Sequence, residues 1–184
     1  MIVILQRLFF NARNILRDVL HIVAIVGGLI TIVACDDALN AAPDFEMNTF
    51  SNANFEAGQV VSLATFEGKP VVLNFWYPSC PPCRLEMPHF ETAFNAYKDQ
   101  GVNFVGIQQV GLDTAEDGQK FIDEFGLTYA LGVDYSTGVM KDYGVVSFPT
   151  TVFLNERHEI VRQWVGLLDE SRLHELVKQL LIGH

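Results

Sequence analysis

Residues 70–83 read PVVLNFWYPSCPPC, an apolar run followed by two cysteines that are separated by two residues. Such a nearly continuous apolar run is typical of a strand that is buried on both faces. Beyond the cysteines, four large apolar residues recur at steps of three, four and three: Met87, Phe90, Phe94 and Tyr97. This spacing places them on one face of a helix. The stretch therefore predicts a buried strand, a short loop and a helix that opens at the cysteine pair.

Strand and helix patterns alternate outward from this stretch. Further strands are predicted at 45–50, 59–63, 102–110, 129–133, 150–154 and 159–165. Helices are predicted from Thr114, where Asp117 completes a capping box, from Ser136 through Tyr143, and from Asp169. The last two strands flank a turn and predict a hairpin. The order predicts an α/β fold in which helices cover both faces of a central sheet.

The cysteine pair carries the candidate chemistry. A CxxC pair that follows a buried strand and opens a helix has the context of a redox motif. Cys80 lies at the helix N-terminus, where unpaired amides and the helix dipole favour a thiolate. Pro81 and Pro82 suit the first turn, where no amide partner is needed. Cys83 lies one turn further in and can attack a mixed disulfide formed by Cys80.

Two other uses of the pair remain open. Half of a zinc site needs two more ligands, but the chain has no second CxxC, and His89, His158 and His174 are scattered. A structural disulfide across a two-residue loop would stabilise the fold little. The sequence therefore favours redox exchange over both alternatives and predicts no metal site.

Glu86 is a candidate partner of the cysteines. It lies three residues after Cys83, beside that thiol on a helix, and shares a face with Phe90, which suggests partial burial. A desolvated carboxylate has a raised pKa and can exchange protons near neutrality. The alternative is an ordinary solvated acid on the helix surface. Trp76 and Tyr77, just before the redox loop, are predicted either to form a substrate-docking surface or to be core and rim aromatics.

The N-terminal segment differs in composition from the rest. The chain of 184 residues has 12 basic and 22 acidic residues, a net charge of −10, which argues against nucleic acid as a partner. Residues 1–34 hold three arginines, one acid and the uncharged apolar run 22–34. A basic start before a short apolar run is typical of an export signal.

Cys35 follows this run directly, after Ile32-Val33-Ala34. This ending resembles the lipobox of bacterial lipoprotein signals, in which the cysteine is lipidated, and an uncleaved membrane anchor is the alternative. Either reading places the body outside the cytoplasm, because the arginines stay on the inner side. We therefore predict a signal or anchor over 1–34, a linker over 35–43 and one domain over 44–184.

The body resembles the thioredoxin-like family, specifically its membrane-anchored TlpA/ResA type of thiol-disulfide oxidoreductase. The matching stretches occur in the family's order: 42–45 (APDF), 68–76 (GKPVVLNFW), 80–88 (CPPCRLEMP), 143–145 (YGV) and 148–151 (FPTT). The resemblance implies a thioredoxin-like fold with a central mixed β-sheet. Typical thioredoxins have a buried Asp in the strand where this chain has Asn74, which cannot titrate.

The resemblance also assigns roles. It implies that Cys80 is the attacking thiol, Cys83 the resolving thiol and Pro149 a cis proline that faces them. The backbone of Phe148 could then pair with an extended substrate. It also implies that Glu86 is functional and that no cofactor is needed beyond the two cysteines. The family typically reduces protein disulfides outside the cytoplasm, often those of apocytochromes c, and is recharged by a membrane electron donor of the DsbD or CcdA kind.

Two other functions are weighed against this one. A peroxiredoxin-like (AhpC/TSA) peroxidase resembles the chain in fold but uses a lone cysteine in a Pro-x-x-x-Thr-x-x-Cys setting, which residues 77–80 do not supply. A copper chaperone of the Sco type uses CxxxC with a distant histidine, and the spacing here is one residue shorter. Both remain alternatives.

Overall fold

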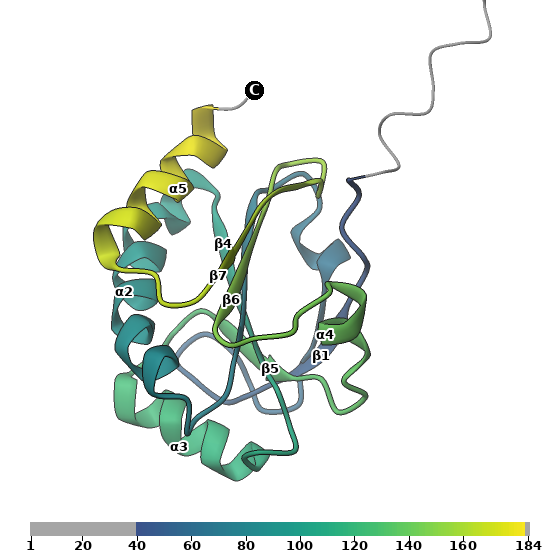
Figure 1. The fold of residues 1–184 in the computed structure, drawn as a ribbon, viewed down its shortest axis with the longest axis vertical. Coiled ribbons are helices and arrows are strands. Elements are labelled where there is room, and N and C mark those ends of the chain that lie inside the picture. The colour runs from purple at the N-terminus through teal and green to yellow at the C-terminus, as the bar shows by residue number, and fades with distance from the viewer. Residues whose placement is uncertain (1–39, 183–184) are drawn as a thin grey trace, which may run out of the picture. The chain divides into compact units, whose positions relative to one another are not determined.

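The computed structural model describes residues 40–182, in which seven strands form one sheet with helices on both faces (Figure 1). The strands are β1 (Glu46–Thr49), β2 (Val60–Ser62), β3 (Val71–Trp76), β4 (Asn103–Gln108), β5 (Ala130–Val133), β6 (Thr150–Leu154) and β7 (Ile160–Val165). Each of them lies within a run predicted as a strand.

The sheet is mixed, as predicted. Its strand order is β2-β1-β5-β4-β3-β6-β7; β3, β4 and β5 are parallel, and all other neighbours are antiparallel. The loops that follow the three parallel strands therefore leave the sheet at one edge. Because Thr150 of the antiparallel β6 pairs with Phe75 of β3, β6 begins at that same edge. The topology thus brings the loop before Cys80 and the segment before Thr150 together.

Two buried clusters hold the helices to the two faces. The helices are α2 (Pro81–Tyr97), α3 (Ala115–Phe125), α4 (Gly138–Asp142) and α5 (Glu170–Ile182), with short 3-10 helices η1 (Leu63–Phe66) and η2 (Lys98–Gln100). One cluster packs α2, α3 and α5 on the sheet, and the other packs α4 and η1 on the opposite face. Val72 and Trp76 point to the first cluster. Because alternate side chains of a strand share a face, Asn74 points to the same face, which α2 covers.

Side chains cap three helices. Cys80 is the N-cap of α2, and Pro81 and Pro82 occupy its first two positions. The predicted capping box of α3 is present: Asp117 N–H donates to Thr114 Oγ1, and Thr114 N–H donates to Asp117 Oδ2. Asp169 accepts the Arg172 amide at 2.8 Å and so caps α5 as expected.

The short helix α4 differs from its prediction. It begins at Gly138, two residues after the expected cap Ser136, and ends at Asp142 rather than at Tyr143. Ser136 Oγ does accept the Gly138 amide at 3.0 Å, but Asp134 Oδ2 accepts the next amide, that of Val139, at 2.8 Å. A carboxylate at the end of β5 therefore shares the capping of this helix, which the sequence pattern did not indicate.

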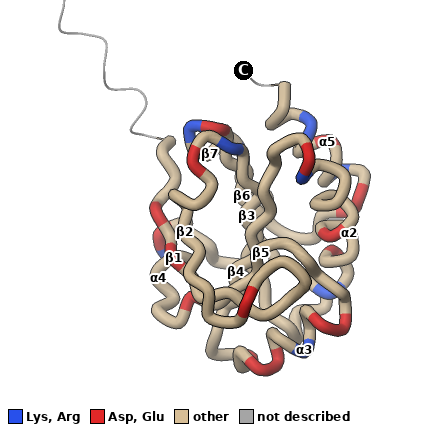
Figure 2. Tube along the Cα trace, turned by 180° about the vertical axis from the view of Figure 1, so that it is seen from behind, with Lys and Arg blue, Asp and Glu red and all other residues tan. Residues whose placement is uncertain are grey.

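The predicted segment 1–34, Cys35 and residues 36–39 of the predicted linker lie outside the described residues. Residues 40–42 lie against β7: Ile160 N–H donates to Asn40 O at 2.7 Å, and Ala42 N–H donates to His158 O at 2.8 Å. None of the helices within 40–182 is long and apolar enough to cross a membrane. Figure 2 shows acidic residues around the whole domain and fewer basic ones, in keeping with the net charge.

Candidate active site

Cys80 and Cys83 form a disulfide at the N-terminus of α2, with their Cα atoms 5.2 Å apart. The Cys83 N–H donates to Cys80 Sγ at 3.2 Å. Pro81 and Pro82 have no N–H, so the Cys83 amide is the first amide of the helix that can donate at all. A thiolate at Cys80 would therefore have one helix amide beside it where most helix N-termini offer several.

Burial does not distinguish the two cysteines. Cys80 is 1% exposed and Cys83 is 0% exposed, so both sulfurs are inside the protein surface in this disulfide state. Their positions differ instead: Cys80 is the N-cap, at the end of the redox loop, whereas Cys83 lies within the helix one turn before Glu86. The asymmetry predicted from the sequence therefore rests on helix position.

The Glu86 carboxyl group is completely buried, beyond the partial burial that the sequence predicted. Its Oε1 accepts Asn74 Nδ2–H at 2.9 Å, and its Oε2 accepts the Leu168 amide at 3.0 Å. Burial raises the pKa of Glu86 to about 8, although the hydrogen bonds from Leu168 and Asn74 favour the charged form and lower it. Glu86 is thus not a solvated surface acid, and it can gain or lose a proton near neutral pH.

Asn74 connects this buried group to β6. Its Nδ2 also donates to Thr151 Oγ1 at 3.0 Å, and Asn74 and Thr151 are both fully buried. The sequence identified Asn74 only as a residue that cannot titrate. Thr151 belongs to the stretch 148–151 (FPTT), but the sequence assigned it no role. The contact of the Leu168 amide with Glu86 was not predicted, because no sequence pattern brings the loop after β7 to α2.

The Phe148–Pro149 peptide bond is cis, as predicted. The Phe148 ring packs edge-to-face on Tyr77, with 5.3 Å between the ring centroids, which joins the loop before β6 to the loop before Cys80. Both rings are half-buried, so a docking role for them stays a prediction. The docking role predicted for Trp76 is wrong. Trp76 is 0% exposed and packs on Phe121, with 4.8 Å between the ring centroids. It is a core residue and presents no docking surface.

Polar contacts on the outer side hold the redox loop to α3 and the loop before it. Ser79 N–H and Oγ–H both donate to Asp113 Oδ2, at 2.9 and 2.8 Å. Arg84 Nη2 pairs with Glu124 Oε1 at 2.5 Å. The Arg84 guanidinium also lies over the Phe121 ring, 5.3 Å from its centroid. The residues that make these contacts line an open hollow of about 270 Å³ beside the loop. No sequence pattern indicated the contacts.

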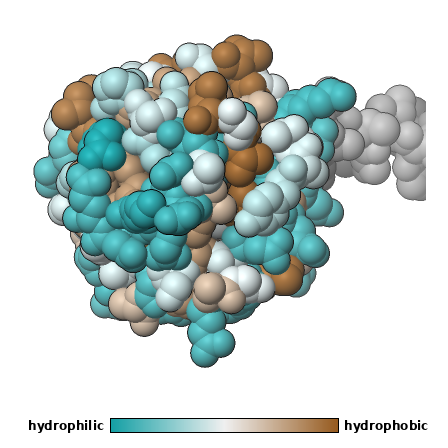
Figure 3. Space-filling view, turned by 90° about the horizontal axis from the view of Figure 1, so that it is seen from below, coloured by the Kyte–Doolittle hydropathy of each residue, from teal (hydrophilic) through white to brown (hydrophobic). Residues whose placement is uncertain are grey.

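Three large exposed apolar residues lie in segments that meet this edge of the sheet. Val146, in the loop before β6, is 93% exposed; Leu112, after β4, is 66% exposed; and Leu85, in α2, is 63% exposed. Figure 3, which views the domain from below Figure 1, shows groups of hydrophobic side chains separated by hydrophilic ones. On the face drawn in Figure 3, exposed apolar side chains thus occur as separate groups.

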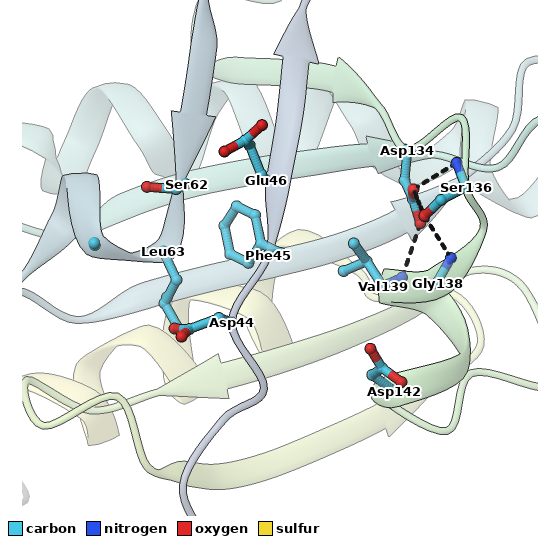
Figure 4. Close-up of a pocket in the computed structure, with 11 residues that line it drawn as sticks. Asp44, Phe45, Glu46, Ser62, Leu63, Asp134, Ser136, Gly138, Val139 and Asp142 are labelled. Carbon is cyan, nitrogen blue, oxygen red and sulfur yellow. Dashed lines mark hydrogen bonds between the residues drawn. The ribbon is translucent and has the colours of Figure 1, made fainter.

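A second, larger hollow of about 540 Å³ lies beside α4 (Figure 4). Four carboxylate residues line it: Asp44, Glu46, Asp134 and Asp142. Asp134 points to the start of α4, where Ser136 and the Val139 amide donate to it. Neither cysteine lines this hollow, so it is separate from the disulfide.

The three histidines singled out from the sequence make separate contacts. Each contacts a different protein oxygen: His89 the Leu168 carbonyl, His158 the Phe66 carbonyl and His174 the Tyr97 hydroxyl. Within residues 40–182, no three side chains of His, Cys, Asp or Glu are arranged to hold a metal ion.

Comparison with known proteins agrees with this geometry. The model of the AhpC/TSA family matches residues 38–163. The thiol-disulfide oxidoreductase ResA of Halalkalibacterium halodurans is 36% identical over 121 residues, which cover 66% of this chain and 68% of the relative. ResA of Oceanobacillus iheyensis is 36% identical over 134 residues, which cover 73% of this chain and 68% of the relative.

Among solved structures, StoA from Bacillus subtilis superposes with a TM-score of 0.64 at 27% identity, covering 75% of this chain and 98% of StoA. The chain therefore belongs to the AhpC/TSA family and, within it, is a thiol-disulfide oxidoreductase of the ResA/StoA type. The predicted thioredoxin-like fold and the predicted enzyme class are both confirmed.

Proposed function

We propose that this AhpC/TSA-family chain reduces disulfides of other proteins while it is held at the outer side of the cytoplasmic membrane. The observation that carries the proposal is the Cys80–Cys83 pair at the start of α2, with the fully buried Glu86 one turn further on. When the dithiol pair becomes a disulfide, the resolving cysteine must give up its proton. The Glu86 carboxylate can accept that proton.

The exchange has two steps. The Cys80 thiolate attacks one sulfur of the substrate disulfide, the substrate S–S bond breaks, and its other sulfur leaves as a thiolate. Cys83 then gives its proton to the Glu86 carboxylate and attacks Cys80, which releases the remaining substrate sulfur. Two electrons pass to the substrate, and the Cys80–Cys83 disulfide forms. The two substrate thiolates take up the proton held by Glu86 and one proton from the solvent, which had received the proton of Cys80.

The reducing direction is supported by the first turn of α2. Because Pro81 and Pro82 have no N–H and the Arg84 amide donates to the Cys80 carbonyl, the Cys83 amide is the one that donates to Cys80 Sγ. The helix therefore stabilises a Cys80 thiolate less than a first turn with every amide free would. A weakly stabilised reduced form gives up electrons readily. Equilibration with glutathione tests this: a potential below that of glutathione supports a reductant, and a potential well above it contradicts the direction.

The membrane position is supported by the sequence of residues 1–35. The three arginines, the apolar run 22–34 and Cys35 favour export followed by lipidation of Cys35. Intact-mass analysis of the full chain from membranes should show an N-terminus at a lipidated Cys35. An unprocessed chain in the cytoplasmic fraction would contradict this part of the proposal.

The partners follow from the resemblance to the TlpA/ResA type. We propose that apocytochromes c are among the substrates and that a membrane electron donor of the DsbD or CcdA kind reduces the Cys80–Cys83 disulfide again. Half-buried Tyr77 and Phe148, beside exposed Val146, are proposed to contact the substrate segment. Mixed disulfides trapped in membranes and identified by mass spectrometry test both partners.

A trapping experiment tests the exchange itself. Cys83→Ser should accumulate mixed disulfides through Cys80, because the resolving thiol is gone. Cys80→Ser is the matched control and should trap far fewer, since its remaining cysteine lies within the helix. Equal trapping by both variants contradicts the assigned roles. Peroxide consumption or stoichiometric copper binding by the reduced protein, with no trapping, would favour the peroxidase or the copper chaperone instead.

A further inference from the structure

The buried side-chain amide of Asn74 has an unbalanced set of hydrogen bonds. Its Nδ2 makes both contacts, to Glu86 Oε1 at 2.9 Å and to Thr151 Oγ1 at 3.0 Å. Its Oδ1 is buried and has no partner in the described part of the chain. Buried polar atoms in folded proteins are rarely left unpaired, so an acceptor of this kind needs an explanation.

The observed orientation suits only one state of Glu86. When the carboxyl group is ionised, both of its oxygens accept, one from Asn74 and one from the Leu168 amide. A proton on Oε2 would oppose the Leu168 N–H. A proton on Oε1 would oppose the Asn74 NH₂, because two donors would then face each other. The protonated acid therefore has no good hydrogen-bond arrangement while Asn74 stays in this orientation.

Turning the amide over gives the protonated acid an acceptor, and it moves the NH₂ group into the place where Oδ1 now has no partner. The oxygen and the NH₂ group of Asn are nearly the same size, so the turn requires no extra volume. Asn74 Oδ1 would then accept the Glu86 Oε1–H and, at the same time, the hydroxyl hydrogen of Thr151. Thr151 can do this because a hydroxyl group donates or accepts as required. The Leu168 bond to Oε2 is kept in both arrangements.

We propose that Asn74 is a positioning residue for disulfide exchange, and that its side-chain amide turns over as Glu86 gains or loses a proton. The inference rests on the proposed role of Glu86 as the proton acceptor for Cys83. It explains why an amide serves at this place in β3: an amide can match either state of Glu86, whereas a carboxylate there would repel it.

Several other groups lie close enough to complicate a pH titration. Tyr129, from β5's side of the core, is affected by the Glu86 charge, but burial raises its pKa well above 10, so it stays protonated. His89 contacts the Leu168 carbonyl, and Asp169 follows Leu168 in the chain. The oxidised protein is the form to use, because its cysteines do not titrate.

The test is NMR of the oxidised chain between pH 6 and pH 9.5. The Asn74 NH₂ protons should show cross-peaks to the Thr151 side chain at high pH and lose them at low pH. The loss should follow the ¹³C shift of the Glu86 carboxyl carbon with one shared midpoint. In Glu86→Gln, the Asn74 signals should not respond to pH over this range.

Two results would overturn the proposal. In one, the Asn74–Thr151 cross-peaks persist unchanged while the Glu86 carbon titrates, which means that the amide stays fixed. In the other, the cross-peaks change equally in Glu86→Gln, which assigns the response to His89 or another neighbour. The experiment uses no substrate, so a failed trapping assay, which would contradict the proposed function, leaves this result interpretable by itself.

Discussion

The two sides of the disulfide are held by contacts of different kinds. On the inner side, Glu86, Asn74 and Thr151 form a hydrogen-bonded group that is completely buried. On the outer side, Asp113 holds the exposed Ser79, and the side chains of the Arg84–Glu124 pair are 39% and 54% exposed. Water can replace the outer contacts but not the inner ones. We therefore expect the inner group to control stability and proton transfer, and the outer contacts to adjust the loop only slightly.

The largest expected effect concerns the dependence of stability on pH. Folded Glu86 keeps its proton up to about pH 8, whereas the unfolded chain releases it near pH 4.5. The free energy of unfolding should therefore fall as pH rises between these values, by on the order of 5 kcal/mol, and level off above pH 8. Denaturant titrations of the oxidised protein measure this, and Glu86→Gln should lack that part of the slope.

If the wild type and Glu86→Gln lose stability in parallel from pH 5 to pH 9, Glu86 is not the buried acid that we describe. Asp117 and Asp169, whose pKa values hydrogen bonds lower, should contribute only in more acidic solution, so work above pH 5 separates their effect.

The next effect concerns Asn74. Replacing it with Leu removes the donor to Glu86 Oε1 and should cost about 1–3 kcal/mol of unfolding free energy. The loss should be greater at pH 9 than at pH 6, because hydrogen bonds to a charged carboxylate are the stronger ones. Thr151→Val, which leaves the Asn74–Glu86 bond in place, is the matched control and should cost less. An equal loss at both pH values would argue that Asn74 serves packing alone.

A smaller effect is expected on the outer side at Asp113. Asp113→Ala removes the acceptor of both Ser79 hydrogen bonds and should cost less than about 1 kcal/mol, because water replaces them. Ser79→Ala loses only the hydroxyl bond and should cost less still. Unfolding free energies and thiol alkylation rates of the reduced proteins provide the comparison. A change in the pH profile of alkylation larger than that in Glu86→Gln would reverse the ranking of the two sides.

The smallest effect is expected for the Arg84–Glu124 pair. Glu124→Gln should change the unfolding free energy by no more than about 0.5 kcal/mol, since the pair is exposed, and this difference should shrink at high salt. Arg84 keeps its contact with the Phe121 ring in the variant. A loss above 1 kcal/mol that is insensitive to salt would indicate that the outer side carries more of the stability than we expect.

The sequence predicts the inner side better than the outer side, for a physical reason. Strand and helix periodicity places Asn74 and Glu86 within regular elements, so their positions follow from spacing alone. The buried run from Pro70 to Trp76 likewise predicts a central strand, yet it leaves Trp76 ambiguous, because an aromatic at a strand end can face core or solvent. Only the packing on Phe121 decides that Trp76 is core.

Contacts between loops could not be predicted in this way. The Leu168 amide on Glu86 and the Asp113 carboxylate on Ser79 join residues 82 and 34 positions apart through irregular segments. No periodicity fixes the direction of such segments, and a backbone amide leaves no mark in the sequence. The same holds for Asp134 at the start of α4, whose carboxylate comes from the strand end before the expected cap.

The central claim is that Glu86 takes the proton of Cys83 as it resolves a mixed disulfide. The most direct measurement is the single-turnover rate of that step, from a preformed mixed disulfide on Cys80, across pH 6 to pH 9.5 in the wild type and in Glu86→Gln. We predict that the variant is slower by about 10²-fold near pH 8, where a large share of Glu86 is ionised and can act as the base. The difference should narrow at pH 6, where Glu86 is protonated, and at high pH, where Cys83 ionises without help. Rates that superimpose over the whole range would contradict the claim.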